Sequence, residues 1–81
     1  LSNYAKLFAK EYGAHKIRMN NVLPGYIDSY PADLKTIEQI PLLRQGTPGE
    51  IADLVKYLAL DNSSYITGQD FIIDGGFTRS N

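Results

Sequence analysis

Residues 20–29 read NNVLPGYIDS, and the fold is predicted outward from this stretch. A short apolar run stops at Pro24-Gly25 and continues as a polar, aromatic loop. Pro has no backbone N–H and a fixed φ, and Gly lets a ligand or another backbone approach closely, so the pair predicts the end of a strand and the start of a contact surface. In an open α/β sheet, ligands bind at this position, beyond the carboxyl ends of the strands.

The residue patterns on both sides of this loop predict alternating helices and strands. Helices are predicted from apolar residues at three- and four-residue spacing and strands from β-branched and apolar runs. The predicted order is a helix over 1–12, a strand over 17–22, a short helix over 32–39, a helix over 47–60 and a strand over 69–73. Thr47-Pro48-Gly49-Glu50 is typical of a helix start with a capping box. We therefore predict an α/β fold in which a βαβ unit holds two parallel strands.

The composition is that of an ordinary globular protein, with 43% hydrophobic residues, 21% charged residues and a net charge of -1. Because basic residues are not in excess, we expect no nucleic-acid partner. The chain has no Cys and only one His, which excludes disulfides and thiolate sites and predicts no metal site. The apolar runs are far shorter than the roughly 20 residues that cross a bilayer. We expect no membrane contact and a cytoplasmic location.

The start of the sequence suggests a piece of a longer protein. The 81 residues begin at Leu1, already within a helical pattern, and the only Met is Met19. Parallel sheets are normally covered on both faces and contain more than two strands. We therefore expect the remaining strands N-terminal to Leu1, so that the fold is incomplete on its own. The alternative, that the 81 residues fold alone as a small α/β domain, stays open.

Two segments carry a series of motifs in order. IRMNNVLPGYIDS, at 17–29, is similar to I-R-V-N-x-V-x-P-G-x-I-x-T, with Met19 for Val and Ser29 for Thr. IPLLRQGTPGEIADLVKYLALDNSSYITGQDFIIDGG, at 40–76, is similar to a segment with P-L-x-R, P-x-E-I/V-A, L-A-x-D, S-Y-I-T-G-Q and D-G-G. Together they resemble the C-terminal third of the short-chain dehydrogenase/reductase family.

The resemblance implies a doubly wound, Rossmann-like sheet that binds NAD(H) or NADP(H) and transfers a hydride between the nicotinamide and a carbonyl or alcohol. The chain would be the C-terminal portion of one such dinucleotide-binding domain. The family's Tyr, Lys, Ser and Asn catalytic residues and its Gly-rich loop would all lie upstream of Leu1, so we expect no catalytic residue here. Tyr12 and Lys16 match the family's Y-x-x-x-K literally. However, they lie directly before a strand, at the edge opposite the ligand, so we interpret Tyr12 as a core or interface residue.

Four loop residues correspond to the nicotinamide side of the family's cofactor site, namely Pro24, Gly25, Ile27 and Ser29. The loop backbone would meet the carboxamide, and the Ser29 hydroxyl would bond the carboxamide or a phosphate. The alternative is that Pro24-Gly25 is only a turn. Tyr26 and Tyr30 flank the loop and would line the substrate pocket, or serve only in packing.

Further expectations concern assembly and the surroundings of the loop. Asn20 is expected to brace the loop by hydrogen bonds, and Asp33 to cap a helix. Asp74-Gly75-Gly76 resembles the family terminus, where the last strand packs against a partner subunit in a homodimer or homotetramer; the local alternative is a strand-ending turn. The short 30–39 region implies an open substrate pocket. A non-catalytic remnant or oligomerisation module of the same fold remains the alternative function.

Overall fold

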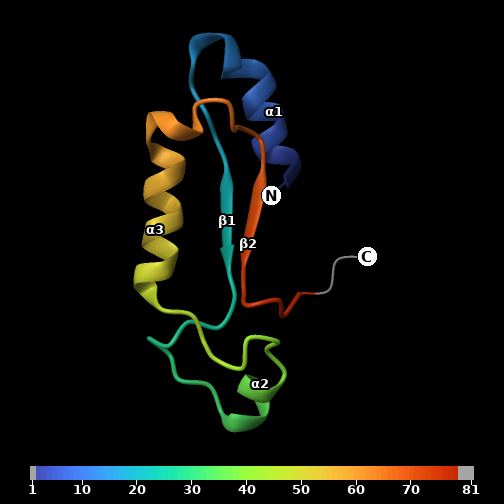
Figure 1. Ribbon diagram of the computed structural model, residues 1–81. Helices are drawn as coiled ribbons and strands as arrows, with labels where there is room; N and C mark the ends of the chain where they lie inside the picture. The colour runs from blue at the N-terminus through green and yellow to red at the C-terminus, as the bar shows by residue number, and fades with distance from the viewer. Residues whose placement is uncertain (1, 79–81) are drawn as a thin grey trace.

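The computed structural model describes residues 2–78, so Leu1 and residues 79–81 lie outside the described part. Figure 1 shows the elements in chain order. They are α1 (Ser2–Tyr12), the 3₁₀ turn η1 (Gly13–His15), β1 (Asn21–Pro24), α2 (Leu34–Glu38), α3 (Pro48–Ala59), the 3₁₀ turn η2 (Asp61–Ser63) and β2 (Asp70–Ile73).

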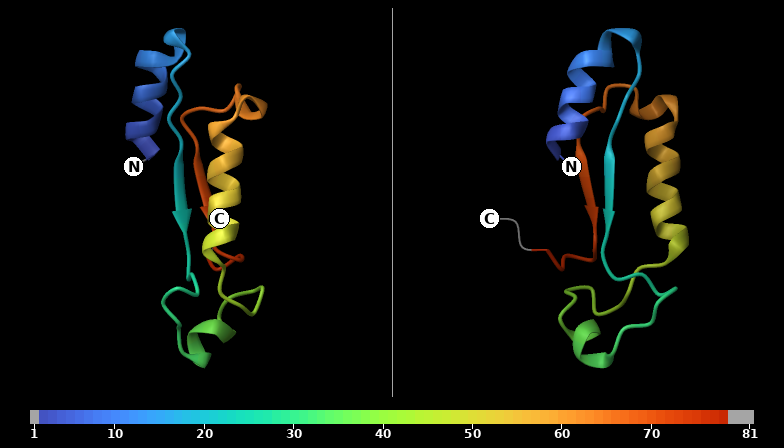
Figure 2. Two further views of the ribbon diagram at one scale, coloured as in Figure 1. Left: turned by 90° about the vertical axis from the view of Figure 1, so that its left-hand side faces the viewer. Right: turned by 180° about the vertical axis from the view of Figure 1, so that it is seen from behind.

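The two strands form a parallel sheet, which confirms the predicted fold class. The register pairs Asn21 with Asp70 and Pro24 with Ile73. The helices α2 and α3 belong to the connection between the strands, while α1 precedes β1. Figure 2 shows α1 on one side of the sheet and α3 on the other. Helices on both faces are the arrangement of a doubly wound sheet.

The strand predicted over 17–22 was wrong in its bounds, because β1 begins only at Asn21. The preceding residues approach the second half of the chain through side chains. Asn20 Nδ2 donates to the Ile66 carbonyl at 3.1 Å, and Asn20 Oδ1 accepts from the Gln69 N–H at 3.1 Å. A side-chain amide thus replaces regular strand pairing at this point. The partners of Asn20 lie before β2, so the expectation that it braces the Pro24-Gly25 loop was also wrong.

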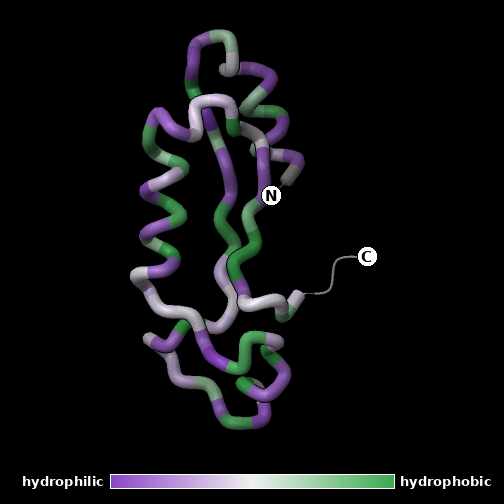
Figure 3. Tube along the Cα trace, viewed as in Figure 1, coloured by the Kyte–Doolittle hydropathy of each residue, from purple (hydrophilic) through white to green (hydrophobic). Residues whose placement is uncertain are grey.

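The capping box predicted for α3 is confirmed. Thr47 Oγ1 accepts from the Glu50 N–H at 3.2 Å, and Glu50 Oε1 accepts from the Thr47 N–H at 3.0 Å. Pro48 occupies the first turn, where its missing N–H has no helical partner to lose. The hydrophobic positions of α3 recur on the side of the helix next to β1 (Figure 3), and among them Leu58 is buried.

The short helix α2 is narrower than the predicted 32–39 and begins after Asp33. Asp33 Oδ1 accepts from the Thr36 N–H at 2.8 Å, which confirms its expected capping role. This hydrogen bond lowers the pKa of the Asp33 carboxyl below its ordinary value. The helix stops before Pro41, because a Pro disfavours helical backbone in the residue before it.

Few apolar side chains are buried within residues 2–78. The buried ones are Ala5, Ile40 and Leu58, whereas Leu7 is 66% exposed and Tyr65 is fully exposed. Both α1 and α3 carry exposed apolar side chains, among them Leu7 on α1 and Val55 on α3. No helix among these residues is long and apolar enough to cross a membrane.

Candidate functional site

A hollow of about 520 Å³ lies at the carboxyl end of β1, beside the start of α3. We call it the carboxyl-end hollow. Its lining residues are Pro24, Gly25, Tyr26, Ile27, Ser29, Tyr30, Pro48 and Ile51. All six residues that the sequence nominated for cofactor or substrate contact therefore line one depression, although their roles in binding remain predictions.

The sequence patterns did not predict that residues of α3 line this hollow. Pro48 and Ile51 come from the first turn of α3, and Ile51 is half-buried. In a βαβ unit, the helix that leads to a parallel strand begins at the edge where the preceding strand ends. The capping box at Thr47 was a signal for that position, since it located the helix start that returns to the loop.

The two tyrosines differ in their surroundings. The Tyr26 ring packs edge-to-face against Phe77, with ring centroids 5.4 Å apart and an interplanar angle of 86°. Tyr30 is 86% exposed and makes no such ring contact within the described residues. Tyr26 thus takes part in packing against the segment after β2, while the Tyr30 side chain is available at the rim of the carboxyl-end hollow.

Gly25 lies in close contact with the end of β2. Its N–H donates to the Ile73 carbonyl at 3.0 Å. A Cβ added at Gly25 would lie 2.6 Å from Asp74 Cβ and 3.0 Å from Asp74 Cα, which is too close for any side chain. The glycine is therefore required by packing within the chain, whether or not a ligand also approaches it.

The turn after β2 packs inside this chain. Gly75 and Gly76 have φ values of +65° and +88°, a region that favours glycine. A Cβ on Gly75 would lie 3.0 Å from Ile40 Cγ2, and a Cβ on Gly76 would lie 3.2 Å from Pro41. Asp74 Oδ1 accepts from the Gly76 N–H at 3.0 Å. The strand-ending turn is thus shown, and a role in subunit packing stays a prediction.

The site loop, residues 25–32, is tied to the connector that precedes α3. Ile27 and Gly46 form an isolated parallel bridge. In this bridge the Gly46 N–H donates to the Tyr26 carbonyl at 2.9 Å, and the Asp28 N–H donates to the Gly46 carbonyl at 2.9 Å. The loop is therefore held by backbone hydrogen bonds from a segment nearly twenty residues away.

Glu50, in the first turn of α3, forms an ion pair with Arg44. Arg44 Nη2 contacts Glu50 Oε2 at 2.8 Å, and Arg44 Nη1 contacts Glu50 Oε1 at 2.9 Å. These hydrogen bonds, together with that from Thr47, lower the pKa of Glu50 to about 2. Glu50 is thus ionised at neutral pH and paired with Arg44.

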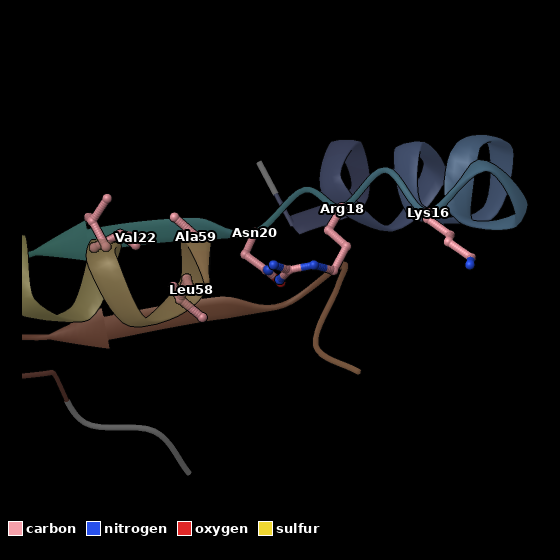
Figure 4. A pocket seen from close by; sticks show the side chains of 7 residues that line it. Lys16, Arg18, Asn20, Val22, Leu58 and Ala59 are labelled. Atoms are coloured by element: carbon pink, nitrogen blue, oxygen red, sulfur yellow. The ribbon is translucent and has the colours of Figure 1, made fainter. Parts of the chain in front are cut away.

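A second hollow, of about 390 Å³, lies at the amino end of β1 and is lined by Lys16, Arg18, Asn20, Val22, Val55, Leu58 and Ala59. Figure 4 shows the Arg18 and Asn20 side chains pointing to the same place, with Val22 and Leu58 farther along. Arg18 and Asn20 both donate to the Ile66 carbonyl, at 3.1 Å each. Their polar groups are therefore engaged in holding the segment before β2.

The literal Y-x-x-x-K match lies away from the carboxyl-end hollow. Tyr12 ends α1, and its ring packs against Phe8 with centroids 4.7 Å apart. Figure 1 shows the end of α1 and the site loop at opposite ends of β1. Tyr12 is nevertheless 42% exposed, so it is not a core residue of the described part, and its role at an interface stays a prediction. No group of three or more His, Cys, Asp or Glu residues suited to a metal occurs within residues 2–78.

Comparison with known proteins identifies the family of this chain. A family model described as enoyl-(acyl carrier protein) reductase matches residues 1–78. The 3-oxoacyl-(acyl-carrier-protein) reductase FabG of Chlamydia trachomatis is 44% identical over 80 residues, which cover 90% of this chain and 32% of that protein. The chain thus spans about a third of the length of the curated relatives that it matches.

Solved structures agree with this relationship. A short-chain dehydrogenase from Bacillus anthracis superposes with a TM-score of 0.89 and 37% identity, covering 99% of this chain and 34% of that one. YwfH, described as an NADPH-dependent reductase, superposes with a TM-score of 0.91 and 33% identity, covering 100% of this chain and 37% of that one. A 4-hydroxyisoleucine dehydrogenase complexed with NADH superposes with a TM-score of 0.85 and 32% identity, covering 99% of this chain and 37% of that one. The match over nearly every residue, in sequence and in backbone, shows that this chain belongs to the short-chain dehydrogenase/reductase family.

Proposed function

We propose that the chain is the C-terminal portion of a single Rossmann-like domain of a nicotinamide-dependent oxidoreductase. The full protein would transfer a hydride between NAD(H) or NADP(H) and a carbonyl or alcohol substrate. The observation that carries the proposal is that Pro24, Gly25, Ile27 and Ser29 share one hollow at the carboxyl end of a parallel strand. In α/β sheets this is the edge at which dinucleotides bind.

The chemistry of the carboxyl-end hollow fits the nicotinamide end of such a cofactor. Pro24, Ile27, Pro48 and Ile51 supply apolar walls for a flat ring, and the exposed Ser29 hydroxyl supplies a hydrogen-bonding group. Bound nicotinamide would supply the hydride donor or acceptor. The residues of this chain would bind and orient that ring, while proton transfer would fall to residues of the preceding part of the protein.

The relatives support a nicotinamide cofactor without deciding between its two forms. One similar structure holds NADH and another is described as NADPH-dependent. We propose Tyr30, with its exposed ring at the rim, as the better candidate for substrate contact, because the Tyr26 ring packs against Phe77. The proposal also includes a cytoplasmic location and a homodimer or homotetramer. Light scattering on the purified full-length protein would test the assembly.

Substitution of Ser29 in the full-length protein tests the cofactor role. Ser29→Ala removes one hydrogen bond and should weaken NADH or NADPH binding by roughly 2- to 12-fold, given that one such bond contributes about 0.5–1.5 kcal/mol. Ser29→Thr keeps the hydroxyl and should keep the affinity. Ser64→Ala, an exposed serine after η2, is the matched control. Cofactor titration by fluorescence measures all four proteins.

Two outcomes would count against the proposal, the first against the proposed function itself and the second against the role of Ser29. One is a wild-type full-length protein that binds neither NADH nor NADPH, which would favour a non-catalytic member of the fold. The other is a Ser29→Ala variant with the same dissociation constant as Ser64→Ala, which would remove Ser29 from the cofactor site.

A further inference from the structure

Gln45 lies in the connector before α3, and its side chain makes three hydrogen bonds to the backbone of the site loop. Gln45 Oε1 accepts from the Ala32 N–H at 3.2 Å. Gln45 Nε2 donates to the Ile27 carbonyl at 3.2 Å and to the Tyr30 carbonyl at 3.1 Å. Both amide donors and one acceptor site are therefore used, all on a segment 13 to 18 residues away in the sequence.

These bonds complete a restraint that the backbone alone provides only in part. The bridge to Gly46 fixes the first half of the site loop, through Tyr26 and Asp28. The second half, which contains Tyr30 and Ala32, is joined to the connector by the Gln45 amide. Ser29 lies between the two restraints. An apolar side chain at position 45 could not make any of these bonds, so part of the second restraint would be lost.

We propose that Gln45 is a positioning residue that keeps Ser29 and Tyr30 on the wall of the carboxyl-end hollow before a cofactor arrives. A preformed loop binds more tightly than a loop that must become ordered on binding. The Gln45 side chain contacts no other part of the carboxyl-end hollow through a hydrogen bond, so its influence on binding runs through the loop. This inference rests on the proposed function, since it assigns the held segment to a cofactor site.

Amide hydrogen exchange in the full-length protein tests the restraint without any cofactor. Gln45→Met keeps the length of the side chain and removes its hydrogen bonds. Exchange of the Ala32 amide should become on the order of tenfold faster, because its acceptor is lost. The Asp28 amide, whose acceptor is the Gly46 carbonyl, should change much less. Gln39→Met, at an exposed glutamine after α2, is the matched control and should leave Ala32 unchanged.

A double-mutant cycle tests whether Gln45 acts through Ser29. In the wild-type background, Ser29→Ala should raise the cofactor dissociation constant by the roughly 2- to 12-fold factor expected above. In the Gln45→Met background, this factor should shrink toward one, because the hydroxyl is no longer held in place. A side chain that contributes only to general stability would leave the factor unchanged.

The outcomes separate the two hypotheses. Unchanged exchange at Ala32 in Gln45→Met would overturn the restraint, and an undiminished Ser29→Ala factor would overturn the positioning of Ser29. Faster exchange at Ala32 together with a smaller factor would support the inference. If the wild-type protein bound no nicotinamide cofactor, the positioning role would fall with the proposed function, while the exchange experiment would still decide whether Gln45 holds the loop.

Discussion

Replacing Gly25 by Ala should destabilise the protein in the absence of any ligand. The added Cβ would lie 2.6 Å from Asp74 Cβ and 3.0 Å from Asp74 Cα, and Asp74 directly follows β2. One of the two backbones must therefore move, although the Gly25 N–H is bonded to Ile73 at 3.0 Å. Overpacking of this kind costs about 1–3 kcal/mol.

The matched control is Gly49→Ala in the first turn of α3. A Cβ there would meet only Thr47 Oγ1, at 3.8 Å, and Ala favours helix over Gly by up to about 1 kcal/mol. The same substitution should therefore destabilise the protein at position 25 and not at position 49. For a protein of roughly 150–250 residues, the melting temperature moves about 2–4 °C per kcal/mol. We expect Gly25→Ala to lower it by about 2 to 12 °C and Gly49→Ala to leave it equal or slightly higher.

Thermal unfolding of the full-length proteins without cofactor is the assay. A Gly25→Ala variant that melts with the wild type would refute the reasoning, because it would show that the approach to Asp74 relaxes at no cost. The result also decides how cofactor binding by Gly25 variants is interpreted. If Gly25→Ala destabilises the protein without cofactor, weaker cofactor binding by a variant with a larger side chain at position 25 cannot be assigned to a lost ligand contact. Ser29 is then the better position at which to test cofactor binding.

Three further predictions concern stability. Thr47→Ala removes the acceptor for the Glu50 N–H and should cost about 1 kcal/mol, seen as a lower urea midpoint; an unchanged midpoint would contradict the capping role. Because the pKa of Glu50 falls from 4.5 to about 2 on folding, its contribution is present above pH about 4.5 and is lost as the pH falls toward about 2. Glu50→Gln should therefore reduce the loss of stability on acidification, and an unaltered urea midpoint profile would count against this. Arg18→Lys should cost about 1–3 kcal/mol in chemical denaturation, because one Lys ammonium cannot replace two guanidinium nitrogens, Nη1 on the Ile66 carbonyl and Nη2 on the Leu60 carbonyl. Arg44→Lys, in an exposed ion pair, should cost clearly less, and equal effects would show that the Arg18 bonds are not specific.

Local signals in the sequence predicted the helices well. The capping box at Thr47 and the Asp33 cap are each complete within four residues, so their hydrogen bonds could be anticipated from the sequence alone. The start of β1 was harder to predict. The apolar character of Ile17 and Met19 resembles that of a strand, but the Asn20 amide takes hydrogen bonds that strand pairing would otherwise supply.

The contacts that shape the candidate site join residues far apart in the sequence and carry no pattern of their own. Gln45 lies within a stretch that reads as a polar connector, and its three backbone partners are defined only once the loop folds back on it. The same holds for Gly25. Its position after Pro24 signalled a turn or a ligand contact, whereas the close neighbour in the structure is Asp74, which lies beyond β2.

The shape of the candidate site and the stability of the fold have different sources in this chain. The site loop is held by hydrogen bonds from Gln45 and Gly46 and by the contact between Gly25 and Asp74, all within residues 25–74. Buried apolar area is small by comparison, because Leu7 on α1 is 66% exposed and Val55 on α3 is 48% exposed. Hydrogen bonds fix geometry but contribute only about 0.5–1.5 kcal/mol each to stability. The proposed Rossmann-like domain resolves this imbalance, since its further strands and helices would cover those side chains and supply the missing apolar burial, leaving the loop with the shape that its own contacts specify.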